Sequence, residues 1–473
     1  MKKNTLYLSL VITFIMLCTS CSDFLNLEPK SNFTGETFYR TEDDFKMALN
    51  GTYHRLQIIY NRYYYQYSEI RSDNCWHSSH KWCDENVMSA NDTKDLWELC
   101  WAAVHTANEL IVHLEPFEMD ATKKQDILTQ ARFIRALTYF NLVRFYGGVP
   151  IQKRPVNEVE AMTIPRQTAE KTYDFIISEL EELKDQLSPE YIDNSKPSSV
   201  VAKALLAQVY LMRCGYPYYT GEWDKVRDYC QEVIATAPFN EAMTWDWKKI
   251  FSADGENSPE FIFSIKYKAG GIGENCEYNR WFSKLEEGSG ILMSEDGFRN
   301  TFEEGDIRRD HSIATTYYEA STGETKKREH VIKFGWSFDS GNNEWGNDLP
   351  IIRYTDIKLM YAEALCEISG EVEDDAVEIL KEVRTRAGLS TTEPQDIDSW
   401  RTALLDERRH EFAYEGVRWF DLVRSNTFLQ ALSDVGKATL FNENHYIFPI
   451  PQKEVDLVNN KDIMWQNPGY FGN

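Results

Sequence analysis

The sequence SVVAKALLAQVYLMR, residues 199–213, has the apolar spacing of a helix in which small residues recur among large ones. Ala202, Ala204 and Ala207 are the small residues, and leucines and valines stand between them. A Gly-Tyr-Pro turn follows, and residues 222–237 then carry bulky apolar side chains at helical spacing. Small residues on one helix and bulky residues on the next let two antiparallel helices nest closely. The stretch therefore predicts a tight helical hairpin.

Apolar residues at helical spacing continue on both sides of this hairpin. Toward the N-terminus they predict helices from residue 42 onward and at 95–114, 127–146 and 168–187, and toward the C-terminus at 355–369 and 375–387. The last two segments repeat the hairpin, and the pattern is typical of a tetratricopeptide-like repeat. Since such hairpins cannot bury their apolar faces alone, they are expected to stack. We predict a mostly α fold with a tetratricopeptide-like helical-repeat scaffold.

The helical spacing becomes weak between residues 238 and 350. Gly, Asn, Ser and Trp are frequent there, as in KAGGIG at 268–273 and SGNNEW at 340–345. A long irregular stretch inside a compact chain is usually functional. We therefore predict that 238–350 is a loop-rich irregular insertion that carries the ligand face. It separates an N-terminal helical part at 42–237 from a C-terminal helical part at 351–473, and the two helical parts are expected to pack together.

Residues 1–20 are predicted to be a lipoprotein signal peptide. Two lysines precede an apolar run of about a dozen residues, which is too short to span a bilayer. Two small residues then precede Cys21, which we expect to be lipidated and to become the mature N-terminus. Two acyl chains suffice for stable membrane anchoring. Residues 21–41 are accordingly expected to form a lipid-anchored tether.

The charge balance limits the possible partners. Of 473 residues, 51 are basic and 75 are acidic, which gives a formal net charge of −24. Proteins that bind nucleic acid usually present a basic surface, so we expect no nucleic-acid partner. Aromatic residues make up 14 % of the chain. This surplus suggests stacking surfaces for a flat, uncharged ligand.

Six stretches, in the same order along nearly the whole chain, resemble the SusD/RagB family of outer-membrane glycan-binding lipoproteins from Bacteroidota. They are CSDFL at 21–25, TQARFIRALTYF with YGGVP at 129–150, AKALLA at 202–207, RYTDIKLMYAEAL at 353–365, ERRHEFAYEGVRWFDLVR at 407–424 and QNPGY at 466–470. These stretches locate the scaffold and not the ligand site.

The resemblance implies a function as well as a fold. It implies a lipid-anchored protein, exposed at the surface of the outer membrane, that is not an enzyme. Such a protein binds an oligosaccharide or polysaccharide and delivers it to a SusC-like TonB-dependent transporter, over which it sits as a lid. Two alternatives stay open: the same scaffold capturing peptides, as some relatives do, and a glycan hydrolase.

Candidate ligand residues come from the connection after the first predicted helix and from the insertion. An indole ring stacks on the apolar face of a pyranose, and neighbouring Asn and Arg side chains bond its hydroxyl groups. In the resembled family both regions contribute to the glycan surface, and the assignment here rests on position. The predicted glycan-binding residues are Arg71, Asp73, Asn74, Trp76, Trp82, Asn86, Trp281, Trp336 and Trp345.

One cluster in the same connection has metal-like spacing: Cys75, His77, His80 and Cys83. No second cluster supports it, and in an exported chain the two cysteines could instead pair or stay reduced. We predict no metal site and no cofactor.

Acidic residues in the C-terminal part were weighed as catalytic groups. Glu411, Glu415, Arg418 and Asp421 are spaced to share one face of a helix, where opposite charges satisfy one another. Glycoside hydrolysis instead needs two carboxyl groups on facing walls. We predict a structural charge network here, extended by Asp356, Glu363 and Arg353, and no catalytic residue.

Overall fold

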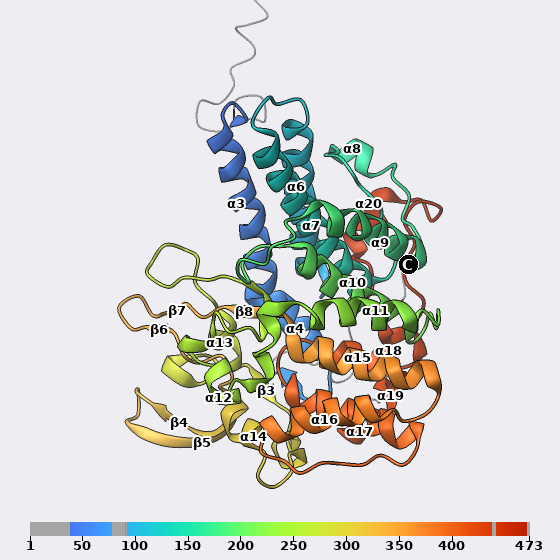
Figure 1. Cartoon of the computed structure of the whole chain (residues 1–473). Helices are drawn as coiled ribbons and strands as arrows, with labels where there is room; N and C mark the ends of the chain where they lie inside the picture. Colours follow the sequence, from blue (N-terminus) through green and yellow to red (C-terminus); the bar gives the residue numbers. More distant parts are fainter. Residues whose placement is uncertain (1–37, 78–89, 91, 438–440, 471–473) are drawn as a thin grey trace, which may run out of the picture. The chain divides into compact units, whose positions relative to one another are not determined.

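The computed structural model describes residues 38–77, 90, 92–437 and 441–470 (Figure 1). Contacts divide the chain into two units, Met1–Asp44 and Phe45–Asn473. Within the described part of the first unit, the Asp44 carboxylate accepts hydrogen bonds from the backbone N–H and the hydroxyl of Thr41, at 2.7 and 2.8 Å. The second unit contains the rest of the described chain.

Long helices form most of this unit, as the sequence predicts. They pack against one another largely in chain order: α6 on α7, α7 on α9, α9 on α10, α10 on α11 and α15 on α16. Their bounds are α3 Glu42–Ile58, α4 Tyr64–Glu69, α6 Lys94–Leu114, α7 Ala121–Tyr146, α9 Ala169–Gln186, α10 Ser199–Cys214, α11 Trp223–Ile234, α15 Tyr354–Ser369 and α16 Asp374–Arg386. Between α3 and α4 the chain forms a π-helical turn, η2 (Ile59–Tyr63).

The helical stack continues across the insertion. About 120 residues separate α11 from α15 in the sequence, yet the two helices pack directly against each other. The intervening segment is therefore looped out of a continuous stack. This contact supports the predicted packing of the two helical parts, while the three-part division of the chain itself stays a prediction.

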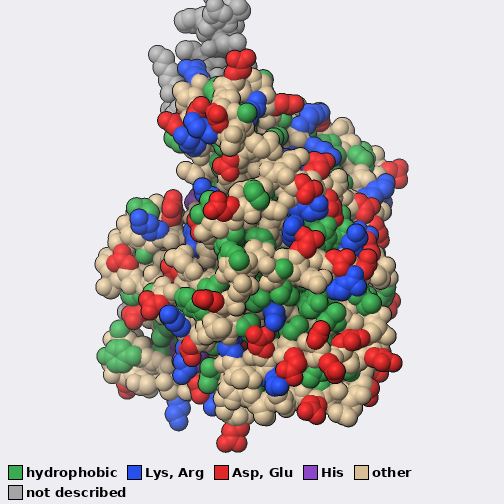
Figure 2. Space-filling model, in the orientation of Figure 1, with side chains coloured by type: hydrophobic (Ala, Val, Ile, Leu, Met, Phe, Trp, Pro, Cys, Tyr) green, Lys and Arg blue, Asp and Glu red, His purple; other side chains and the backbone are tan. Residues whose placement is uncertain are grey.

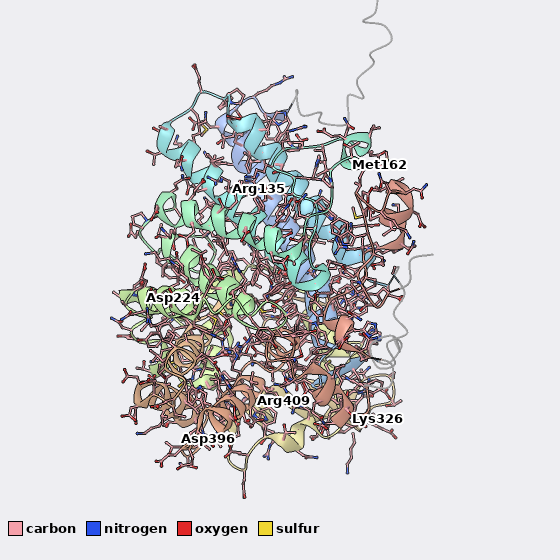
Figure 3. The ribbon with its side chains drawn as sticks, turned by 90° about the vertical axis from the view of Figure 1, so that its right-hand side faces the viewer. Arg135, Met162, Asp224, Lys326, Asp396 and Arg409 are labelled. Carbon is pink, nitrogen blue, oxygen red and sulfur yellow. The ribbon has the colours of Figure 1, made fainter. Side chains whose placement is uncertain are left out.

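Helix α7 begins earlier than predicted. The apolar spacing indicates a start at 127, but the helix begins at Ala121. The Asp120 carboxylate accepts a hydrogen bond of 3.0 Å from the Lys123 N–H and so caps the helix. The first turn is polar and leaves no apolar signal. Further along α7, Arg135, which is labelled in Figure 3, forms an ion pair of 2.5 Å with Glu179 of α9.

The insertion forms two-stranded antiparallel ladders joined by short helices, and one ladder includes a strand from outside the insertion. The pairs are β1 (Cys75–His77) with β3 (Leu292–Ser294), β2 (Phe261–Ile265) with β8 (Leu349–Arg353), β4 (Ile313–Glu319) with β5 (Glu324–Val331), and β6 (Phe338–Asp339) with β7 (Glu344–Trp345). The short helices are α12 Trp247–Ile250, α13 Tyr278–Phe282 and α14 Ile307–Ser312. In Figure 1 these elements gather on the left, beside the helical stack.

The C-terminal part adds α17 (Ile397–Glu411), α18 (Arg418–Arg424), α19 (Phe428–Asp434) and α20 (Gln452–Val458). The remaining short elements are α8 Glu158–Ala161 and the 3-10 turns η3 Ala237–Phe239, η4 Ala242–Thr244, η5 Ala253–Gly255, η6 Leu285–Glu287, η7 Phe298–Thr301 and η9 Glu443–Tyr446.

The apolar core falls into a large cluster and a smaller one. The large cluster runs through the helical stack and into the insertion, and the smaller one lies between α15, α16 and α17. Figure 2 shows acidic and basic side chains interspersed over the helical side of the molecule. In the part of the chain that the structure describes, no helix combines the length and the apolar composition that a membrane crossing requires.

Candidate ligand-binding face

The carboxylates weighed as catalytic groups lie at a corner between two helices. Helix α17 ends at Glu411 and α18 begins at Arg418, so the prediction that these residues share one helical face is wrong. The chain turns at Gly416, whose φ of 76° is left-handed. A Cβ at this position would meet the ring of Tyr64 at 2.6 Å. The corner therefore requires glycine, and the glycine breaks the helix.

The predicted charge network is confirmed except for Arg418, which pairs with Asp73 instead. Arg308 of α14 pairs with Asp306, Glu407 and Glu411 at 2.8, 2.5 and 3.2 Å. Glu415 accepts from Lys333 at 2.6 Å and from Arg353 at 2.7 Å, and Arg353 also bonds Glu411. Asp421 pairs with Arg408 and Arg424, whose other partners are Asp356 and Glu363. We call this set, all of it buried, the charge network.

The electrostatics of the charge network favour an ionised Glu411 at its centre. Burial raises the pKa of Glu411, but Arg353, Arg386 and Arg308 outweigh burial and hold that pKa below its ordinary value. The carboxylate is thus charged and fully engaged by guanidinium groups. Its role is to tie α17 to α14, α16 and β8.

Arg71, a predicted ligand residue, lies in the interior. Its guanidinium group sits over the rings of Trp419, Phe441 and Phe448, with 4.8 to 5.0 Å to their centroids. It also donates a hydrogen bond to the backbone carbonyl of His445. A ligand on the surface cannot reach this buried side chain, so Arg71 anchors the scaffold.

Asp73 and Asn74 are also buried and are bonded to arginines. The Asp73 carboxylate accepts hydrogen bonds of 2.8 and 2.9 Å from Arg418 and pairs with Arg409 at 3.1 Å. Arg409 also donates to Asn74 at 2.7 Å (Figure 3). Asp73 and both arginines line a groove of about 510 Å³ next to α17, α18 and α19. Their side chains hold the wall of this groove in place and are not free to bind hydroxyl groups.

Trp76 keeps part of its indole at the surface. It lies in β1 directly opposite Met293 of β3. Successive side chains of a strand point to opposite faces, and its neighbours Cys75 and His77 are buried, so Trp76 points outward. Trp82 and Asn86, together with His80, Cys83 and Cys21, lie outside the described residues.

Trp281 is half-buried and lies on α13, which packs against β3 and η2. The guanidinium of Arg62 stacks on its ring at 3.7 Å from the centroid, and the indole N–H donates to Glu277 at 3.3 Å. Because β3 contacts both β1 and α13, the structure brings the elements of Trp76 and Trp281 into one neighbourhood. We call Trp76, Trp281 and Arg62 the indole face.

The two remaining tryptophans differ from each other. Trp336 is half-buried, and its N–H donates to Glu256 at 3.0 Å. Trp345 is only 5 % exposed and packs on Phe338, with 4.9 Å between ring centroids. Trp345 is therefore part of the core, contrary to its predicted place in a ligand surface. Arg62 was not among the residues predicted to bind the ligand. The only signal near it in the sequence is the tyrosine-rich run NRYYYQY at 61–67.

Comparison with known proteins matches two family models to the chain. The "SusD family" model matches residues 338–470, and the model "Starch-binding associating with outer membrane" matches residues 23–211. SusD-like protein P2 of Formosa agariphila is 28 % identical over 97 % of this chain and 99 % of its own length. Starch-binding protein SusD of Bacteroides thetaiotaomicron is 22 % identical over 72 % of both chains.

Solved structures share the fold at lower identity. A SusD superfamily protein from Parabacteroides distasonis superposes with a TM-score of 0.78 and 23 % identity, covering 93 % of this chain and all of the other. A laminarin-binding SusD-like protein gives a TM-score of 0.77 and 23 % identity, over 91 % of this chain and all of the other. With two models that match opposite ends of the chain and relatives that align along nearly its whole length, this mostly helical protein belongs to the SusD/RagB family.

Proposed function

We propose that this protein is a lipid-anchored, non-enzymatic protein of the outer-membrane surface that binds an oligosaccharide or polysaccharide and delivers it to a SusC-like transporter. Members of its family bind starch and other glycans, as the names of its relatives record. A surface glycan-binding protein of Bacteroides thetaiotaomicron that shares this fold has been solved with laminarihexaose, with a TM-score of 0.74 and 20 % identity over 90 % of this chain and all of the other.

The observation that carries the proposal is the indole face. Trp76 and Trp281 leave part of their rings in solvent although the chain has ample core positions. An exposed indole stacks on the apolar face of a sugar ring, and Arg62 and Glu277 stand beside Trp281 to bond hydroxyl groups. A neutral sugar also tolerates the acidic surface of a chain with a net charge of −24.

The buried carboxylates support a binding role rather than hydrolysis. A glycosidase needs one carboxyl group to donate a proton and a second to attack or to activate water across an open site. In the charge network the carboxylates are buried and held by arginines. Membrane anchoring and delivery rest on the signal sequence, on Cys21 and on the family.

Affinity electrophoresis tests the ligand class. The purified mature chain is run through native gels that contain laminarin, starch, xylan or galactomannan, and we expect at least one polysaccharide to retard it. A peptide digest serves as the competing ligand in a parallel titration. Binding of peptides without any polysaccharide would favour the peptide alternative, and release of reducing sugar by the purified protein would contradict a non-enzymatic role.

Labelling of cells with radioactive palmitate tests the anchor. We expect the wild-type protein to carry the label and to co-purify with an outer-membrane transporter. The Cys21→Ala variant should lose the label and appear in the soluble fraction. Retention of the label by this variant would contradict acylation at Cys21.

A further inference from the structure

The turn between α10 and α11 carries a second aromatic surface, far in sequence from the indole face. Tyr216 contacts Tyr219 edge-to-face, with ring centroids 6.1 Å apart and planes at 75°. It contacts Tyr446 of η9 in the same manner, at 5.5 Å and 82°. Tyr216 and Tyr446 are half-buried, and Tyr219 is 61 % exposed. We call these three residues the tyrosine platform.

The tyrosine platform stands on a rigid base. The Tyr216 N–H donates to the carbonyl of Arg424, the last residue of α18, at 2.8 Å. Gly215 permits this close approach, since a Cβ there would lie 2.4 Å from the same carbonyl oxygen. The Tyr219 N–H donates to the Gly215 carbonyl at 2.9 Å, and the Tyr216 hydroxyl to the Glu443 carbonyl at 3.3 Å. A site held in this way loses little conformational entropy on binding.

Neither backbone preference nor burial accounts for a tyrosine at position 219. Its φ of 48° lies in the left-handed region, which glycine adopts without cost and bulky side chains avoid. Its side chain is mostly in solvent, so it gains little from packing. A strained residue that persists although packing covers little of it is often a functional one.

We propose that the tyrosine platform is a second carbohydrate-binding site, which takes the apolar face of one or two sugar rings. Tyrosine rings stack on sugars as indoles do, while their hydroxyl groups stay in water. The proposal rests on the proposed glycan-binding function and adds a second location for the same ligand class.

The extent of the surface favours a sugar over a protein partner. A stable protein interface buries about 800 Å² per partner around an apolar centre. The segments 213–222, 424–428 and 441–446 form this surface. Among their described residues, Tyr219 is the only large apolar side chain that is exposed. Sugar rings match an aromatic area of this size.

The two sites lie on different sides of the fold. In Figure 1, α13 with Trp281 lies on the left, and α18 and α19, which flank the tyrosine platform, lie on the right. A long polysaccharide that engages both sites gains effective concentration at the second site, whereas a short oligosaccharide does not. Retention by polysaccharide should therefore depend on both aromatic surfaces.

The test uses affinity electrophoresis of the mature chain in laminarin, starch, xylan and galactomannan. The variants are Tyr219→Gly, Trp281→Ala and the two combined. Tyr318→Ala is the matched control, because Tyr318 on β4 is similarly exposed, at 66 %. We expect Tyr219→Gly to weaken retention about threefold while the melting temperature stays equal or rises, since glycine suits this backbone. The double variant should lose retention, and the control should migrate like the wild type.

Hydroxyl-radical footprinting with mass spectrometry gives a direct readout on the wild-type protein. We expect oxidation of Tyr219 to fall about twofold when a retarding polysaccharide is added, because a stacked sugar covers the ring. If the wild type is retarded but Tyr219→Gly migrates with it and Tyr219 gains no protection, the second site is refuted and the proposed function stands. If no polysaccharide retards the wild type, both fail. Protection of Tyr219 by the co-purified transporter alone would make this surface a protein interface.

Discussion

The charge network and the indole face both consist of residue types that are common in functional sites. The charge network is buried, whereas the indole face is partly exposed to solvent. Glu411, Glu415 and Asp421 are buried and each is bonded to arginine or lysine. Trp76 and Trp281 keep part of their rings in solvent. A buried charge must be paired, so the ion pairs account for the presence of these carboxylates in the interior. Packing covers Trp76 and Trp281 only in part, and this difference points to the ligand surface.

The largest effect is expected when a cation at the centre of the charge network is removed. Arg308→Met would remove the buried arginine that pairs with Asp306 and one of the cations that neutralise Glu407 and Glu411. We expect the free energy of unfolding to fall by about 3–5 kcal/mol, the usual cost of an uncompensated buried charge. Urea unfolding followed by circular dichroism measures it. A loss below about 1 kcal/mol would show that the network behaves like surface ion pairs.

The second prediction concerns Glu69, which lies beside the network and accepts a hydrogen bond from the Gly416 N–H. Burial raises the pKa of Glu69 to about 8, so the folded state retains a proton that the unfolded state releases near pH 4.5. Stability therefore falls as the pH rises from about 4.5 to 8. Glu69→Gln removes this dependence and should stabilise the protein by about 2–4 kcal/mol at pH 8.

The measurement is urea unfolding of both proteins between pH 5 and pH 8. The advantage of Glu69→Gln should shrink toward pH 5, because the cost of the buried Glu69 falls as the pH approaches about 4.5, below which both states hold the proton. A constant difference across this range would mean that the Glu69 carboxyl does not titrate as proposed.

The third prediction concerns the indole face. Trp281→Ala should weaken glycan binding about tenfold, or ~1.4 kcal/mol, by removing one stacking ring. Trp345→Phe is the matched control, since Trp345 is buried and should leave affinity unchanged. Isothermal titration with the glycan that retards the protein compares them. Equal losses in both variants would mean that the effect comes from the fold and not from the indole face.

The smallest effect is expected for an exposed ion pair. Arg401 of α17 pairs with Glu367 at 2.6 Å, but its side chain is 48 % exposed. Arg401→Met should cost less than about 1 kcal/mol, because water already solvates both charges and salt screens them. The same urea titration measures it beside Arg308→Met. A cost as large as that of Arg308→Met would remove the distinction between buried and exposed pairs.

Much of the scaffold follows from local sequence pattern. Helices α9, α10, α15 and α16 lie within a residue or two of their predicted bounds, because their apolar stripes and end signals are local. Helix α7 begins early because an aspartate cap replaces the apolar signal. The break at Gly416 was missed because the need for glycine comes from Tyr64, hundreds of residues away.

The ligand face was harder to predict. Trp76 and Trp281 were predicted from residue type and position in the chain, and the structure leaves both side chains partly in solvent. Arg71 and Trp345 were named on the same grounds and are buried. Nothing local separates the two outcomes. The rings that enclose Arg71 come from positions 419, 441 and 448, and the ring that covers Trp345 comes across the β6–β7 ladder.

The helices, the family resemblance and the pairing of opposite charges follow from apolar spacing and residue type, which are local properties of the chain. Which aromatic rings remain in solvent and which carboxylates are enclosed follows only from the packing of the folded chain. Burial depends on contacts with segments that are distant in the chain, as when α15 packs on α11 across the insertion. The local sequence does not specify these contacts.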